Sequence, residues 1–247
     1  MTNDFVIKNG ILEKYRGKER DVIIPDGVTT IGLEAFKGCK RIKTVTIPDG
    51  VINIDASAFA ECTNLQHVTI PMSVRNISLY SFAFCDKLND IVIPQSVTHI
   101  GNSAFSCCES LTNIIIPDSV TDIGNGAFKG CGKLSDENGF VIVKNKLYDY
   151  VGDAEIATIP DGVTYIGIAA FYGCINLTDL NVPESVLHID KCAVRRCRKL
   201  TNVTIQNPAA NFGELAISDC EGVTIHGHKD SSAECFAKEN NIKFEVI

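Results

Sequence analysis

The prolines of this 247-residue chain fall at a nearly constant interval, and this interval constrains the fold more than any other feature. Five successive prolines lie 23 residues apart, the next follows after 43 residues, and the last two follow after 23 and 25. They are Pro25, Pro48, Pro71, Pro94, Pro117, Pro160, Pro183 and Pro208. A repeat of this length is typical of a solenoid, in which each unit buries its apolar face against its neighbours. We therefore expect a stack of similar coils.

Apolar residues recur at fixed distances after the first seven prolines. The third residue is always Val and the sixth always Ile, while the eleventh is Phe in six repeats and Val194 in the seventh. The fourteenth residue is always Cys and the seventeenth is Leu or Ile. The cysteine column consists of Cys39, Cys62, Cys85, Cys108, Cys131, Cys174 and Cys197. When coils stack, such columns become ladders that run through the core.

Each repeat contains three local patterns. The alternation before the proline, as in Val45-Thr46-Ile47, predicts a short strand whose middle residue faces outward. The proline ends that strand and begins a turn, after which Val-Thr-x-Ile predicts a second extended segment. Apolar residues three apart in Ala-Phe-x-x-Cys-x-x-Leu predict about one helical turn at the second corner.

The combined spacing Leu-x-x-Val-x-Ile-Pro-x-x-Val-x-x-Ile-Gly-x-x-Ala-Phe-x-x-Cys spans nearly all of the chain and resembles the BspA-like class of bacterial leucine-rich repeats. The resemblance implies a right-handed, curved leucine-rich-repeat solenoid, mostly β with short helical turns and with a parallel sheet on its concave face. It also implies a surface or adhesion-type protein that works by binding. The first 20 residues lack the pattern of a secretion signal. The sequence alone therefore favours a cytoplasmic location, whereas the resemblance favours the cell surface or secretion.

Two similar leader segments occur, one before the first repeat and one between the fifth and sixth repeats. In the first, Asn9-Gly10 lies between two apolar runs, which predicts a β-hairpin. The same spacing recurs from Phe140 to Tyr150 and accounts for the long gap before Pro160. We predict one solenoid over residues 1–247, with a domain boundary near residue 138 as the alternative. Its parts are a hairpin cap (1–24), repeats (25–138), an inserted hairpin (139–159), repeats (160–207) and a C-terminal cap (208–247).

The C-terminal cap is predicted from the degenerate eighth repeat and the residues that follow it. Ser231 and Glu234 match a helix capping box, which predicts a helix from about Ser232 to Glu239. The alternating residues 242–246 predict a final strand. Together these elements should seal the end of the core.

The charge of the chain limits its partners. A net charge of -7 opposes binding to nucleic acid or to an anionic membrane, because both need a basic face. No apolar run approaches the roughly 18 residues of a membrane span. Two basic clusters nevertheless occur, and we interpret them as solvated corners, with an acidic protein or glycan as the functional alternative. They are Lys37, Lys40, Arg41 and Lys43, and Arg195, Arg196, Arg198 and Lys199.

The eleven cysteines permit several kinds of chemistry. Neighbouring coils about 4.8 Å apart bring column cysteines within range of disulfides. However, a thiol beside Phe and Leu columns behaves as a small hydrophobe, and zinc needs four converging ligands. We predict free structural thiols in the column and expect Cys107, Cys192 and Cys235, outside it, to react first.

No motif indicates catalysis. His226 and His228 offer two imidazoles to a metal, but no third ligand is evident nearby. Phosphate-binding loops, dinucleotide fingerprints and hydrolase or metalloprotease motifs are absent from the sequence. The sequence therefore predicts no catalytic residue, no metal site, no cofactor and no enzyme.

The outward positions of the pre-proline strands are the best candidates for binding. These positions include Thr46, His67, Thr69, Asp90, Val92, Asn113, Ile115, Asp179 and Asn181. Threonine is common on exposed sheet surfaces, but Val92 and Ile115 should be neighbours, and an exposed apolar pair in a polar ladder indicates a contact surface. We predict a scaffold that binds a protein or glycan through this sheet. The alternative is a structural or self-assembling repeat protein without a specific ligand.

Overall fold

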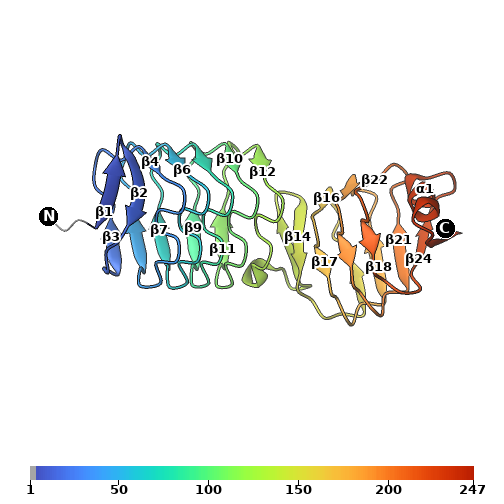
Figure 1. Ribbon diagram of the computed structural model, residues 1–247. Helices are drawn as coiled ribbons and strands as arrows, with labels where there is room; N and C mark the ends of the chain where they lie inside the picture. The colour runs from blue at the N-terminus through green and yellow to red at the C-terminus, as the bar shows by residue number, and fades with distance from the viewer. Residues whose placement is uncertain (1–3) are drawn as a thin grey trace. The chain divides into compact units, whose positions relative to one another are not determined.

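The computed structural model describes residues 4–247, which form two compact units. The N-terminal unit runs to Leu134 and the C-terminal unit from Ser135 to Ile247. Both are β-solenoids, mostly strand with little helix, so the predicted leucine-rich-repeat fold is confirmed (Figure 1). Residues 1–3 of the predicted cap lie outside the described residues. The continuity of one solenoid over residues 1–247 stays a prediction.

The N-terminal unit contains a seven-stranded sheet and two shorter sheets. The seven-stranded sheet comprises β1 (Phe5–Lys8), β2 (Ile11–Tyr15), β4 (Thr30–Ile31), β6 (Asn53–Ile54), β8 (Asn76–Ile77), β10 (His99–Ile100) and β12 (Asp122–Ile123). The pre-proline strands are β3 (Asp21–Ile23), β5 (Thr44–Thr46) and β7 (His67–Thr69) in one sheet, and β9 (Asp90–Val92) and β11 (Asn113–Ile115) in the other. A short 3-10 helix covers Gly132–Leu134.

The C-terminal unit repeats this plan. Its first sheet comprises β13 (Phe140–Val143), β14 (Lys146–Tyr150), β16 (Tyr165–Ile166), β19 (His188–Ile189) and β22 (Asn211–Phe212). Its second sheet comprises the pre-proline strands β15 (Ile156–Thr158), β18 (Asp179–Val182) and β21 (Asn202–Ile205), followed by β24 (Thr224–Gly227) and β25 (Lys243–Val246). A third sheet comprises β17 (Phe171–Tyr172), β20 (Val194–Arg195) and β23 (Ile217–Ser218).

A β-hairpin lies at or near the start of each unit, as the repeated leader predicts. Asn9 and Gly10 connect β1 to β2, and both have positive φ, at 49° and 77°. Lys144 and Asn145 connect β13 to β14 in the same way, at 45° and 62°. Turns with two left-handed residues suit hairpins because they match the twist of the strands. The second strand of each hairpin then pairs in parallel with the next coil, β2 with β4 and β14 with β16.

The predicted columns form ladders in the core. In the N-terminal unit the rings of Phe36, Phe59, Phe82, Phe105 and Phe128 stack, each fully buried. The distance between ring centroids grows from 4.8 Å at the first pair to 5.6 Å at the last. Ile31, Ile54, Ile77 and Ile100 are likewise inaccessible to solvent, whereas Ile123 ends their ladder and is half-buried. Burial of these repeated side chains holds the coils together.

The second corner of the fifth coil contains the 3-10 helix at Gly132–Leu134, whereas that of the third coil differs from the predicted helical turn. In the third coil, Tyr80 and Phe84 adopt left-handed φ values of 54° and 59°, and the segment is a succession of turns. The N–H groups of Tyr80, Phe82 and Phe84 donate to carbonyls of the next coil over 2.8 to 3.0 Å. A helical turn would direct these N–H groups to carbonyls within its own coil. Hydrogen bonding between coils therefore replaces helix at this corner.

The C-terminal cap agrees with its prediction. Helix α1 covers Ser232–Glu239, and the side chain of Ser231 accepts a hydrogen bond from the N–H of Glu234. The carboxylate of Glu234 accepts from the N–H of Asp230, the residue before the N-cap, over 2.7 Å. The final strand β25 then pairs with β24 in parallel.

Candidate binding site

Strand alternation separates inward from outward side chains on the pre-proline strands. In β9 the middle residue Ile91 is buried, whereas Asp90 and Val92 on either side are exposed. The strands β3, β5 and β7 show the same inward middle residue. We use the name strand face for the outward side chains of β3, β5, β7, β9 and β11 in the N-terminal unit. The predicted inside and outside assignments hold along these strands.

Val92 and Ile115 lie directly opposite each other on neighbouring parallel strands. Their side chains are 63% and 57% exposed, respectively. Asp90 and Asn113 form the adjacent pair on the same two strands and are also exposed. The structure therefore brings together the four residues that the repeat spacing places at the centre of the candidate site.

A side-chain contact joins the two pre-proline sheets of the N-terminal unit. β7 and β9 belong to different sheets, and the backbone bond from Asn89 N–H to the carbonyl of Gln66 is long, at 3.5 Å. Nδ1 of His67 lies 3.0 Å from Oδ1 of Asp90, which spans this break. The candidate residues on β7 and β9 are thus connected by side chains where the backbone ladder is interrupted.

The strand face extends further than the sequence analysis placed it. Thr46 and Thr69 are exposed as predicted, and Ile23 occupies the matching position of β3 with 75% exposure. Sequence reasoning missed Ile23 because it precedes the first proline of the series. Ile23 lies two residues before Pro25, as Val92 lies two residues before Pro94, and this shared spacing could have identified it as an outward position. The strand face therefore carries exposed apolar side chains at its N-terminal end, at Ile23, and at its C-terminal end, at Val92 and Ile115.

The remaining candidates, Asp179 and Asn181, lie on β18 in the C-terminal unit and are half-buried. Asp179 accepts a hydrogen bond from Asn202 over 2.8 Å, and Asn181 donates to Thr158 over 3.1 Å. Asn202 in turn lies 3.0 Å from Nε2 of His226. Polar groups on this sheet therefore satisfy one another across the coils, in contrast to the apolar pair of the strand face.

The column cysteines have a shared structural role. Five of them are buried, and each thiol donates a hydrogen bond of 3.0 to 3.2 Å to the carbonyl of the Phe in the preceding coil. These are Cys62, Cys85, Cys108, Cys131 and Cys197. Burial raises the pKa of the Cys62 thiol to about 12 and that of Cys85 well above its ordinary value. The raised pKa values keep the thiols of Cys62 and Cys85 protonated at neutral pH, which opposes nucleophilic chemistry.

The cysteines outside the column differ in accessibility. Cys235 is exposed on α1 and Cys107 is half-buried, and that they react first stays a prediction. Cys192 is buried, and its sulfur lies 4.0 Å from Nη1 of Arg195. This burial contradicts the expectation that Cys192 is among the first thiols to react, which rested on its place outside the cysteine column.

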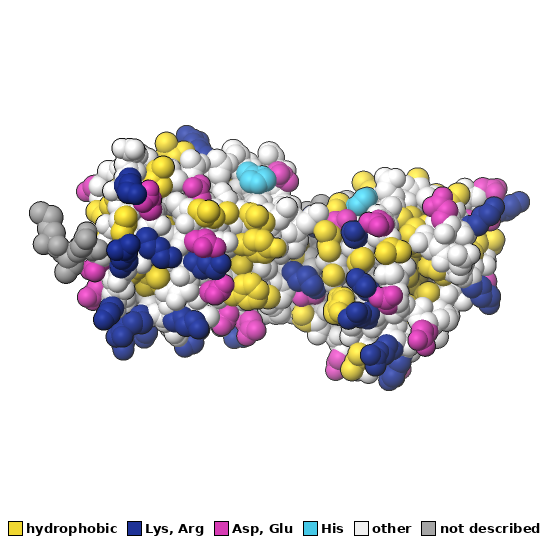
Figure 2. Space-filling model, viewed as in Figure 1, with side chains coloured by type: hydrophobic (Ala, Val, Ile, Leu, Met, Phe, Trp, Pro, Cys, Tyr) yellow, Lys and Arg dark blue, Asp and Glu magenta, His cyan; other side chains and the backbone are white. Residues whose placement is uncertain are grey.

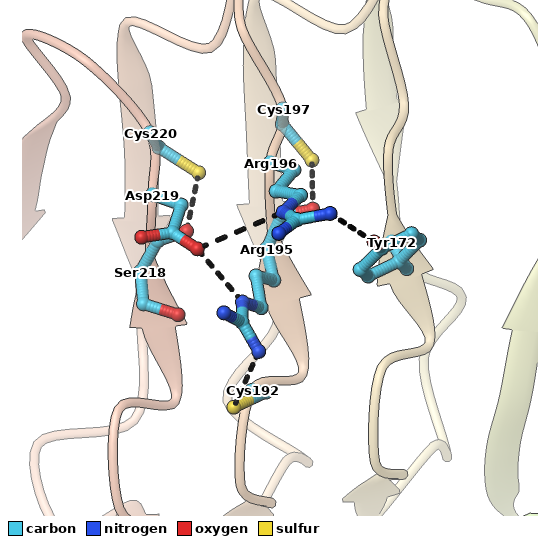
Figure 3. Close-up of polar contacts among 8 residues, drawn as sticks. All are labelled: Tyr172, Cys192, Arg195, Arg196, Cys197, Ser218, Asp219 and Cys220. Atoms are coloured by element: carbon cyan, nitrogen blue, oxygen red, sulfur yellow. Dashed lines mark hydrogen bonds and ion pairs between the residues drawn. The ribbon is translucent and has the colours of Figure 1, made fainter.

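Two members of the basic cluster of the C-terminal unit, Arg195 and Arg196, have polar partners within the unit. Nε of Arg195 lies 2.8 Å from the carboxylate of Asp219, and Nη1 of Arg196 donates to the hydroxyl of Tyr172 over 2.7 Å (Figure 3). The guanidinium of Arg196 also lies over the Tyr172 ring, 5.7 Å from its centroid. These contacts link three neighbouring coils and support the interpretation of Arg195 and Arg196 as a structural corner.

No metal centre or membrane-spanning helix is found in residues 4–247. No group of three or more His, Cys, Asp or Glu side chains there could hold a metal ion. No helix in this part of the chain is long and apolar enough to cross a membrane. His226 lies 3.7 Å from Glu245 and contacts Asn202, while His228 is exposed.

Comparison with protein families gives one match that covers most of the chain. The model of the BspA type leucine rich repeat region matches residues 13–135 and 141–245, in six copies. No curated protein matches the sequence.

Several solved structures resemble the chain along most of its length. A leucine-rich repeat protein of T. pallidum is 24% identical with a TM-score of 0.51, over 95% of this chain and 89% of that one. A leucine-rich cell surface protein of Faecalibacterium prausnitzii is 22% identical with a TM-score of 0.50, over 100% and 94%. A leucine-rich repeat protein of Eubacterium ventriosum is 23% identical with a TM-score of 0.55, over 87% and 77%. At these identities the likeness establishes the fold.

Proposed function

Because this chain belongs to the family of BspA-type leucine-rich repeat proteins, we propose that it is a non-catalytic scaffold that binds a protein or glycan through the strand face. Solenoids of stacked repeats present extended surfaces suited to this task. One of the similar solved structures is described as a leucine-rich cell surface protein, which favours a partner met at a bacterial cell surface. Burial of the column thiols supports a role without catalysis.

The exposed pair Val92 and Ile115 carries the proposal. Two large apolar side chains lie side by side on neighbouring strands, with Asp90 and Asn113 in the adjacent row. An apolar centre within a polar rim is the usual anatomy of a binding interface. Contact with a partner would remove both apolar side chains from water, which favours association.

A charge-introducing double variant tests the strand face. We expect Val92→Glu with Ile115→Lys to keep its fold, because both side chains point away from the core. Wild-type and variant proteins would serve as baits for proteins and glycans of the bacterial surface and its surroundings, with captured material measured quantitatively by mass spectrometry. A partner that binds through this face is lost from the variant.

Met72→Glu provides a matched control. Met72 is 61% exposed, similar to Val92, but lies in the turn after Pro71 and outside the strand face. A partner retained by Met72→Glu and lost from the double variant supports the proposal. Equal capture by all three proteins, at equal melting temperatures, contradicts it.

A further inference from the structure

A second surface of the N-terminal unit concentrates positive charge. A hollow of about 350 Å³ is lined by Arg20, Lys40, Arg41, Lys43 and Asn64. These residues belong to the segments that lead into the pre-proline strands, and Lys43 directly precedes β5. Figure 2 shows Lys and Arg side chains gathered along the lower edge of this unit, near its N-terminal end. We call this surface, together with Lys87, the basic edge.

The repeat places these cations on successive coils. Arg20 and Lys43 occupy the same position of adjacent coils, and the N–H of Lys43 donates to the carbonyl of Arg20 over 2.6 Å. Arg41, Asn64 and Lys87 occupy another shared position on three coils. Neighbouring coils lie about 4.8 Å apart. The charges therefore run along the stack as a row instead of converging on one point.

Asn64 is held at the centre of this row. Its amide nitrogen donates to the carbonyl of Lys40 over 2.7 Å, and its amide oxygen accepts from Nζ of Lys87 over the same distance. Asp21 follows Arg20 in the sequence, but its carboxylate accepts a hydrogen bond from the hydroxyl of Thr44. One acidic group beside the row is thus hydrogen-bonded to the next coil.

The cations of the basic edge form no ion pair with a carboxylate in the part of the chain that the structure describes. Within residues 4–247, the ion pairs formed by basic side chains involve other residues, and the four cations that line the hollow form none. Elsewhere, oppositely charged residues on adjacent coils form ion pairs, as Lys191 and Glu214 do at 2.7 Å. Like charges on adjacent coils repel each other, and a bound anion relieves that repulsion. The basic edge therefore favours binding of a polyanion, although the whole protein carries a charge of -7.

We propose that the basic edge binds a linear acidic polysaccharide that carries sulfate or carboxylate groups. Arginine binds such oxyanions in a forked geometry and lysine binds them as a point charge. A linear polymer with a charged group on successive sugars can follow the row from coil to coil. Single-stranded nucleic acid is less suitable, because its sites use aromatic side chains for base stacking and none lines the hollow. This site is separate from the strand face and does not depend on it.

The experiment compares two double variants with the same charge change. Lys40→Gln with Arg41→Gln removes two cations from the basic edge. Arg198→Gln with Lys199→Gln removes two exposed cations from the same repeat positions in the C-terminal unit, beside Asp219 and Glu221. The probes are heparin for sulfate, polygalacturonate for carboxylate and dextran as the neutral polysaccharide, measured by calorimetry at low ionic strength. Asn64 contacts the backbone of Lys40, so the first variant keeps that hydrogen bond.

We expect wild-type protein to bind heparin or polygalacturonate but not dextran, with an affinity that falls as salt is added. The basic-edge variant should bind about tenfold more weakly or worse, with a shallower salt dependence, while the C-terminal variant stays within about twofold of wild type. Equal losses in the two variants, or no binding to either acidic polysaccharide, would overturn the proposal. Tighter binding of single-stranded DNA or polyglutamate than of both acidic polysaccharides would also overturn it. Unchanged melting temperatures establish that both variants are folded.

Discussion

The thiol of Cys85 donates a hydrogen bond to the backbone carbonyl of Phe59, one coil earlier, over 3.2 Å. Both side chains are fully buried, so this contact joins two of the core ladders. It explains why a cysteine suits this position: the side chain fills apolar space and also supplies a donor to a carbonyl that lies away from water.

Replacing this thiol should weaken the fold. We expect Cys85→Ala to lower the free energy of unfolding by about 1 to 3 kcal/mol, because it leaves a small cavity and removes the donor to Phe59. Cys235→Ala, at an exposed position on α1, should change it by about 0.5 kcal/mol or less. Urea denaturation under reducing conditions measures both. Similar losses in the two variants would contradict the role assigned to the column.

The buried thiols should also make stability fall at alkaline pH. An unfolded cysteine has a pKa of about 8.5, whereas burial raises the pKa of Cys62 to about 12. The stability that the buried, protonated Cys62 thiol contributes is fully present below the pKa of the unfolded state. It is lost as the pH rises toward the pKa of the folded state, since only the unfolded chain gives up the thiol proton in this window. The loss approaches about 1.4 kcal/mol per pH unit for each such thiol.

Comparison with Cys62→Ala isolates this effect from other alkaline titrations. The free energy of unfolding would be measured from about pH 7 to about pH 10 for both proteins. We expect a shallower decline in the variant. Curves that stay parallel across this range would show that Cys62 does not contribute.

The Ile ladder should be more sensitive than the strand face. Ile77 is inaccessible to solvent and pairs with Ile54 on one side and Ile100 on the other. We expect Ile77→Ala to cost about 2 to 5 kcal/mol of unfolding free energy, as large-to-small core changes do. Thr46→Ala, on the exposed face, should cost about 0.5 kcal/mol or less. Equal shifts in melting temperature would mean that the inward and outward assignments are wrong.

The capping residue of α1 offers a test at the C-terminal end. The buried side chain of Ser231 accepts the N–H of Glu234, so Ser231→Ala should cost about 1 kcal/mol. Glu239→Ala, at the exposed end of the same helix, serves as the control and should have little effect. Both would be compared by thermal unfolding. A larger loss in the control would contradict the capping role.

The repeat period made much of the fold predictable, because identical positions on stacked coils must become neighbours. Val92 and Ile115 lie opposite each other on neighbouring strands because they are 23 residues, one repeat, apart. The hairpin at Asn9-Gly10 and the helix after Ser231 were predictable because local turn and capping chemistry specifies them. Each of these depends on spacing or on a few adjacent residues.

Features that depend on contacts between coils were not predictable in this way. The apolar spacing around Phe82 fits both a helical turn and the observed succession of turns, and only the hydrogen bonds to the next coil decide between them. The contact of Arg195 with Asp219 is diagonal, because Arg195 is in register with Ser218. The interruption between β7 and β9 leaves no mark in the repeat pattern.

The two hairpins affect the order in which the coils of the chain form during folding. A hairpin closes a short loop and forms in about 1 to 10 μs, faster than pairing between distant strands. β2 and β14 each then offer an edge to which the first parallel strand can add, so ordering can proceed coil by coil from a local start. Because each compact unit contains such a start, the N-terminal unit can complete its coils during synthesis before the C-terminal unit has emerged from the ribosome.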